Sequence, residues 1–122
     1  MKRLIILLAV LVGACGGNEA SPAIPLTGEA LIVAGEDSYQ RFCAACHGAD
    51  LRGSDQGPSL LSIVYEPSHH SDFAFVSASK NGAPAHHWGF GDMPAIPGIS
   101  DAEIGAVTAY VRSVQEAEGF DE

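Results

Sequence analysis

The chain has 122 residues, of which 6 are basic and 15 acidic, and its net charge is −9. This length allows one small domain with a modest hydrophobic core. The acidic excess argues against nucleic acid as a partner, because binding to phosphates requires a basic patch.

The first 14 residues have the pattern of a secretory signal peptide. Lys2 and Arg3 form a basic start, and residues 4–12 are an uninterrupted apolar run. The run is shorter than the roughly 20 residues that a transmembrane helix needs. We therefore expect residues 1–14 to direct export from the cytoplasm.

Cys15 stands where a bacterial lipoprotein carries its lipid. Residues 11–15 read Leu-Val-Gly-Ala-Cys and resemble a lipobox, in which the cysteine after the cleavage point becomes lipid-modified. The departure is Val12, where a lipobox usually has Leu. The alternative is an ordinary signal peptide, with Cys15 a free thiol or lost on cleavage. A lipid anchor on Cys15 is favoured, because an unpaired cysteine in an exported protein otherwise needs explaining.

Residues 15–33 have the composition of a flexible tether, with Gly, Pro and Ser at intervals and no sustained periodicity. Such a coil spans about 25 Å on average. The folded domain is predicted over residues 34–119, followed by a short tail at 120–122. Without the signal, four basic residues remain against 15 acidic ones, a net charge of −11.

The first predicted helix begins near Glu36 and ends at Gly48. It carries Cys43, Cys46 and His47 in the pattern C-x-x-C-H, which attaches a c-type haem. Cysteines three residues apart lie on one face of a helical turn, so both thiols can bond to the vinyl groups of one porphyrin. The adjacent imidazole of His47 is then available to the iron.

Two other uses of the cysteine pair remain open. Thiol–disulfide oxidoreductases also contain C-x-x-C, but usually in a βαβ context, and no strand pattern is found nearby. A structural zinc site needs four ligands, and the only other cysteine is Cys15. Covalent haem is the favoured interpretation.

The rest of the domain is predicted to contain two more helices joined by loops. Residues 48–71 and 83–99 are loops rich in Gly, Pro and Ser, and residues 72–80 form a helix after Ser71. The last helix starts with a capping box between Ser100 and Glu103. Its apolar stripe consists of Ile104, Val107, Val111 and Val114. The predicted fold class is all-α, with three main helices and long loops around one covalently attached haem.

Met93 is the candidate for the second axial ligand of the iron. It is the only methionine after Met1, and Pro94 biases its backbone toward an extended conformation. A thioether favours ferrous iron, so His/Met ligation raises the reduction potential. The alternative is a gap-filling core side chain.

Two histidine pairs and one tryptophan complete the set of candidates. The pairs His69-His70 and His86-His87 lie in the predicted loops. They are interpreted as surface or propionate-side residues, although a distal iron ligand or a transition-metal site is also open. Trp88 is interpreted either as a cover or hydrogen-bond donor at the haem or as an ordinary loop aromatic.

The chain resembles the class I, mono-haem cytochromes c over about residues 34–116. The resemblance is carried by Cys43-Ala44-Ala45-Cys46-His47-Gly48, Gly57-Pro58-Ser59-Leu60, Met93-Pro94 and Ala109-Tyr110-Val111-Arg112, in that order. It implies one covalent haem c, with the Pro58 carbonyl accepting the imidazole proton of His47. It also implies that Tyr39 and Tyr110 pack where the first and last helices cross.

The function implied by the resemblance is one-electron transfer rather than enzymatic chemistry on a small-molecule substrate. With the export signal, it predicts a carrier in the periplasm or at the outer face of a bacterial membrane, held there by the lipid anchor. The negative charge favours redox partners with a basic docking surface. Two alternatives are a haem subunit of a larger oxidoreductase and a haem peroxidase or gas sensor with an open distal position.

Overall fold

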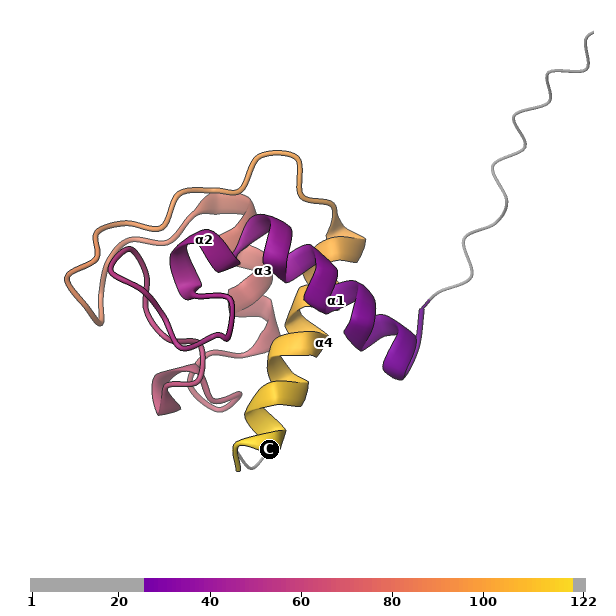
Figure 1. The fold of residues 1–122 in the computed structure, drawn as a ribbon. Coiled ribbons are helices and arrows are strands. Elements are labelled where there is room, and N and C mark those ends of the chain that lie inside the picture. Colours follow the sequence, from indigo (N-terminus) through magenta and orange to yellow (C-terminus); the bar gives the residue numbers. More distant parts are fainter. Residues whose placement is uncertain (1–25, 120–122) are drawn as a thin grey trace, which may run out of the picture.

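The structure of the protein is a computed structural model that describes residues 26–119. The elements in this range are α1 (Glu29–Phe42), α2 (Ala44–His47), the 3-10 turn η1 (Ile63–Tyr65), α3 (Asp72–Asn81) and α4 (Asp101–Ala117) (Figure 1). Between residues 26 and 119, the strand-like pairing is limited to one isolated bridge, Ala83 with Met93. The predicted all-α fold class is confirmed. The signal segment, Cys15 and the tail at 120–122 lie outside the described residues.

Helix α1 begins at Glu29, earlier than the start near Glu36 that the sequence predicts. Residues 29–33, assigned above to the tether, are therefore helical. Gly28 precedes them with a φ of 58°, and Glu29 places an acidic side chain in the first turn. Ile32 lines a shallow pocket together with Ala109 and Ser113 of α4. Packing of α1 on α4 stabilises a first turn that the composition alone does not reveal.

The predicted first helix is interrupted at Cys43. The backbone of Cys43 departs from ideal helical geometry, with φ −120° and ψ −36°, and separates α1 from α2. Its carbonyl still accepts from the N–H groups of Cys46 and His47, at 3.1 and 3.0 Å. Gly48 ends α2 with a φ of 78°, as predicted. Cys43, Cys46 and His47 thus share one turn.

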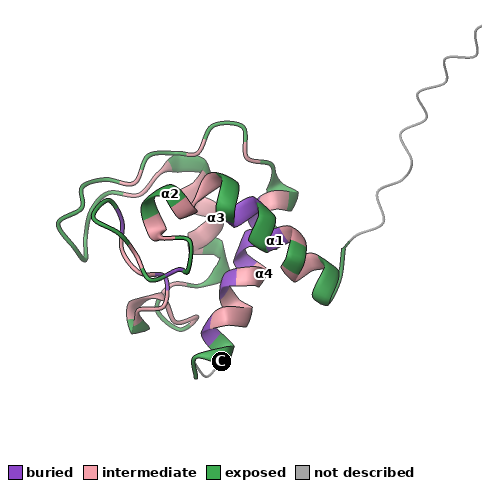
Figure 2. Ribbon diagram, viewed as in Figure 1, coloured by how far each residue is buried: buried purple, intermediate pink, exposed green. Residues whose placement is uncertain are grey.

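Helices α1 and α4 approach each other closely where they cross. A Cβ atom on Gly35 would lie 2.7 Å from the carbonyl carbon of Ala106 and 2.8 Å from Cβ of Tyr110. The rings of Tyr39 and Tyr110 lie 5.7 Å apart at this crossing, as the resemblance implies. Buried residues concentrate on these two helices in Figure 2.

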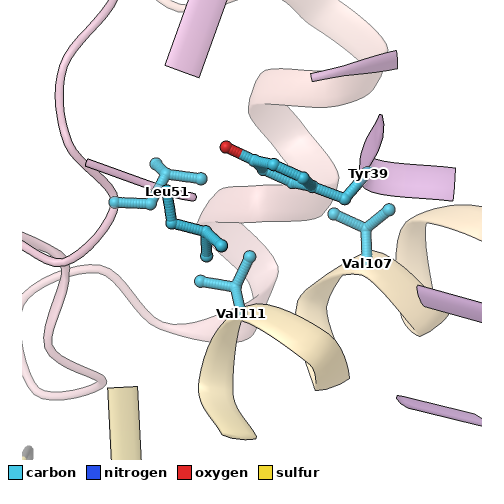
Figure 3. Close-up of a cluster of buried hydrophobic side chains, with 5 residues drawn as sticks. Tyr39, Leu51, Val107 and Val111 are labelled. Atoms are coloured by element: carbon cyan, nitrogen blue, oxygen red, sulfur yellow. The ribbon is translucent and has the colours of Figure 1, made fainter. Parts of the chain in front are cut away.

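The hydrophobic core lies beside this crossing. Its buried members are Tyr39, Leu51, Leu60, Val107 and Val111. Figure 3 shows the Tyr39 ring beside Leu51, with Val107 and Val111 rising from α4. Two of the five residues come from the loop after α2, so the core joins that loop to the helix pair.

Helices α3 and α4 agree closely with the prediction. The capping box is present, because Ser100 Oγ accepts from the Glu103 N–H and the Glu103 carboxylate accepts from the Ser100 N–H. Helix α3 packs on α4, and an ion pair of 2.8 Å joins Asp72 to Arg112. None of the helices in residues 26–119 has the length and apolar character that crossing a membrane requires.

We expect Gly35→Ala to lower the free energy of unfolding by about 1–3 kcal/mol, because the added methyl group overpacks the α1–α4 crossing. The matched control is Gly105→Ala, also in a helix, where a Cβ would meet no atom within 4 Å. That control should raise stability by about 0.5–1 kcal/mol. Denaturant unfolding of the haem-loaded protein measures both. Equal effects of the two substitutions would contradict the close-packed crossing.

Candidate haem site

Cys43, which precedes α2, and Cys46, within α2, occupy different environments on the same turn. Cys43 is partly buried and packs against the hydrophobic core, whereas Cys46 is exposed. Burial, with a smaller contribution from the charge of Cys46, raises the pKa of the Cys43 thiol to about 11. A thiol-exchange nucleophile requires a lowered pKa instead. The electrostatics at Cys43 therefore oppose the oxidoreductase interpretation.

His47 is oriented by a backbone carbonyl. Its Nδ1 lies 2.9 Å from the carbonyl oxygen of Pro58, so the Nδ1–H donates and the lone pair remains on Nε2. This contact is the one that the resemblance implies. A hydrogen bond of this kind fixes the tautomer and ring direction of a metal-ligating histidine. It also makes the imidazole a stronger electron-pair donor to the metal.

The loop after α2 folds back onto the turn that carries the cysteines. Ser54 Oγ donates to the Cys46 carbonyl at 2.6 Å, and the Gly53 N–H donates to the His47 carbonyl at 2.8 Å. Gly57 approaches the same turn so closely that a Cβ would lie 2.8 Å from the Cys46 oxygen. These contacts bring the Gly57-Pro58 segment to the imidazole. Gly57 is thus required for the orientation of His47.

Tyr39 connects the helix crossing to the same turn. Its side chain is fully buried, and its hydroxyl donates to the Gly48 carbonyl at 2.6 Å. Burial raises the pKa of this phenol far above its usual value, with smaller contributions from Cys43 and Tyr110. The hydroxyl therefore stays protonated and remains a donor. Tyr39 ties the end of α2 to the core.

Met93 lies on the loop between α3 and α4, where its backbone is held by hydrogen bonds. It is half-buried, and it exchanges two hydrogen bonds of 2.9 Å with Ala83. A Cβ on Gly82 would lie 2.6 Å from the Met93 carbonyl oxygen, so glycine is needed there. Asp92 Oδ1 accepts from the Ala85 N–H at 2.9 Å and closes the loop between them. Sequence reasoning missed Gly82 and Asp92 as positioning residues.

Trp88 lies on the same loop and contacts η1. Its ring stacks on Tyr65 with centroids 5.7 Å apart and an interplanar angle of 22°. The side chain is 37% exposed. The contact shows how the loop before α4 is attached to the loop after α2. A role of Trp88 at the haem stays a prediction.

The two histidine pairs meet in space, which their separation in sequence does not show. His69 Nε2 and His87 Nε2 lie 3.3 Å apart, and His70 contributes a third ligand nitrogen within 4.8 Å of the others. Partial desolvation and the neighbouring imidazoles lower the pKa of His87. Neither pair by itself predicts that the two pairs are neighbours in the fold.

The residues of the α2 turn fit a covalently held porphyrin. Both thiols are free and share one turn, one thiol lies at the edge of the core, and His47 uses Nδ1 for Pro58, which leaves Nε2 available. Two thiols and an imidazole are the donor set that haem attachment requires. Residues 32–115 match the family model described as cytochrome c. The chain belongs to the cytochrome c family.

Curated relatives agree with this assignment. Cytochrome c-551 of Bacillus subtilis (strain 168) is 37% identical over 105 residues, covering 84% of this chain and 82% of the relative. A cytochrome bc1 complex cytochrome c subunit of Corynebacterium diphtheriae is 33% identical over 90 residues, covering 70% of this chain and 28% of the relative. The cbb3-type cytochrome c oxidase subunit CcoP of Rhodobacter capsulatus is 29% identical over 91 residues, covering 70% of this chain and 30% of the relative.

Membership of this family has two implications. Cytochromes c hold a covalently bound c-type haem, and they function in electron transfer. In the bc1 and cbb3 subunits, the matching region is less than a third of a longer chain. The matching region covers 82% of cytochrome c-551.

We expect Gly57→Ala to displace Pro58 from His47, because the new Cβ would overlap the Cys46 carbonyl. A weaker hydrogen bond from Nδ1–H makes the imidazole a poorer electron-pair donor to the iron. The reduction potential of the haem-loaded protein should therefore rise. The free energy of unfolding should fall by about 1–3 kcal/mol. Redox titration and denaturant unfolding measure the two effects.

Gln56→Ala is the control for this substitution, because its side chain is exposed and adjacent in sequence. It should change neither quantity. A Gly57→Ala protein with an unaltered potential would show that the Pro58 carbonyl does not tune His47.

Proposed function

We propose that the protein is a one-electron carrier with one haem c, exported and anchored by a lipid at the outer face of a bacterial membrane. The assigned roles are thioether bonds at Cys43 and Cys46, axial ligation by His47 and Met93, haem contact by Pro58 and Trp88, and lipidation of Cys15.

The hydrogen bond from His47 to Pro58 is the observation that supports this proposal most directly. It directs Nε2 away from the backbone and leaves its lone pair for the iron. A bound c-type haem supplies an iron that accepts and releases one electron. The roles of the protein are then to hold the ligands in both oxidation states and to keep the site closed.

Ligation by Met93 would favour the carrier over the enzyme, because a second protein ligand would occupy the position that a substrate needs. Its backbone is fixed by the pairing with Ala83, and the proline after it restricts its conformation. The thioether favours the ferrous state, which suits an acceptor of electrons. Constant ligation also keeps structural change during transfer small.

The surface charge supports a partner with a basic docking face. Residues 26–119 contain 12 acidic residues against four basic ones, an excess of eight. Each of the four basic side chains pairs with a carboxylate: Arg41 with Glu103, Arg52 with Glu118, Lys80 with Asp101 and Arg112 with Asp72. The negative excess is thus left for intermolecular attraction, which speeds association at low salt.

Membrane attachment is proposed through the segment before α1. The lipobox-like residues 11–15 support lipidation of Cys15, and the Gly- and Pro-containing stretch up to Gly28 supports a tether. Because α1 begins at Glu29, the proposed tether ends at residue 28 instead of residue 33. Several acyl chains would hold such a protein at the membrane surface.

We expect the ferric protein to show the long-wavelength sulfur-to-iron charge-transfer band and Met93→Ala to abolish it. The substitution removes the thioether that favours ferrous iron, so the reduction potential should fall. Optical spectroscopy and redox titration measure both. A wild-type protein that lacks the band and is high-spin would overturn the carrier and favour a peroxidase or gas sensor.

Gly82→Ala separates the positioning of Met93 from the presence of its sulfur. It should weaken the band while Met93 is retained, because the new Cβ would overlap the Met93 carbonyl. Gly89→Ala, in the same loop with no atom within 4 Å of the added Cβ, should leave the band unchanged.

We expect Cys15→Ser to move the protein from the membrane fraction to the soluble fraction after cell lysis, because the acceptor for the lipid is lost. Labelled fatty acid should be incorporated into the wild type and not into the variant. The control Val12→Leu restores the usual lipobox residue and should keep the anchor. Continued membrane retention of an unlabelled Cys15→Ser protein would contradict lipid anchoring.

A further inference from the structure

A three-histidine cluster, His69, His70 and His87, lies where the loop after η1 meets the loop that carries Met93. One nitrogen from each residue falls within 4.8 Å of the other two. His69 and His87 are exposed and His70 is half-buried, so solvent ions have access to the cluster. No cysteine or carboxylate is part of this group. Its donors are therefore imidazoles alone.

The separation of the first two donors fits metal binding. His69 Nε2 and His87 Nε2 are 3.3 Å apart. Two imidazole nitrogens at the usual zinc distance of about 2.0 Å, in tetrahedral geometry, lie about 3.3 Å from each other. Lone pairs on two nitrogens at this distance repel each other unless a proton or a metal ion lies between them. The two Nε2 atoms are thus already separated by the distance expected for two ligands of one metal ion.

His70 is oriented by contacts outside the cluster. Its Nδ1 lies 2.7 Å from the Val64 carbonyl oxygen, so the Nδ1–H donates and the lone pair is on Nε2. This is the kind of second contact that orients a metal-ligating histidine. Arg112 of α4 donates to the backbone carbonyl of His70 and also to that of Tyr65. The His70 ring is therefore held in place before an ion binds.

We propose that His69, His70 and His87 bind one divalent transition-metal ion, of the class of Zn²⁺ or Cu²⁺, with water completing the coordination. Imidazole is a preferred ligand of both ions, and three histidines with an open position form a known type of zinc site. None of these three ligands is one of the haem donors Cys43, Cys46 and His47, and the proposal does not depend on the proposed function. The bound ion would cross-link the loop after η1 to the loop that holds Met93.

The test is a Zn²⁺ titration of the haem-loaded protein in competition with a chromogenic chelator. We expect one ion per chain and a loss of affinity of at least about 100-fold in His69→Ala and in His87→Ala, because loss of a direct ligand exceeds the cost of losing an outer contact. His86→Ala is the matched control. Its ring is a neighbour of His87, but it is outside the ligand set, so affinity should be unchanged.

Two further measurements make the result independent of folding and of the haem. The optical spectrum of the haem should be the same in wild type, His69→Ala and His87→Ala, and Zn²⁺ should raise the thermal midpoint of the wild type alone. With Cu²⁺ as the probe, pulsed electron paramagnetic resonance should detect coordinated imidazole nitrogen that His87→Ala weakens.

Three outcomes would overturn the proposal. Equal weakening by His86→Ala would show diffuse binding rather than a three-histidine site. A changed haem spectrum in the variants would assign these histidines to the iron instead. Wild-type affinity no tighter than that of the double variant His69→Ala, His87→Ala would remove the site, and the electron-carrier proposal would remain unaffected.

Discussion

The contact between the backbones of α1 and α4 at Gly35 is the constraint on which the rest of the structure depends. A side chain there would overlap Ala106 and Tyr110, so the two helices approach closely only because position 35 is glycine. The crossing fixes Tyr39, whose buried hydroxyl reaches the Gly48 carbonyl and holds the end of α2. The geometry of the haem-attachment turn is therefore set by packing between helices rather than by the C-x-x-C-H segment alone.

The carbonyl groups of the α2 turn hold the loop that follows α2. Ser54 and Gly53 donate to the carbonyls of Cys46 and His47, and these bonds fold the following loop over the turn. The same loop supplies the Pro58 carbonyl that orients His47 and two leucines of the core. One segment thus connects core packing to the direction of the proposed iron ligand. This explains why a long irregular loop is closely packed.

Helix α4 supports the two loops that carry the remaining candidate residues. Arg112 bonds to the carbonyls of Tyr65 and His70, and the buried Gln115 donates to the carbonyl of Leu60 at 2.7 Å. Stacking of Trp88 on Tyr65 then attaches the loop of Met93 to this support. The position of Met93 and the histidine cluster share one scaffold. In our two proposals, an ion held by the histidines would restrain the segment that presents the thioether.

The sequence by itself determined the all-α class, the three main helices, the C-x-x-C-H turn and the family. These follow from local signals: helical periodicity, the Ser100–Glu103 capping box and fixed spacing of donors. Only the tertiary structure decided where α1 starts and that the helix breaks at Cys43. It also decided that glycine is needed at positions 35, 57 and 82, and that His69 meets His87. Each of these depends on the approach of segments that are distant in sequence, and a local pattern carries no record of which backbone or ring lies across from it.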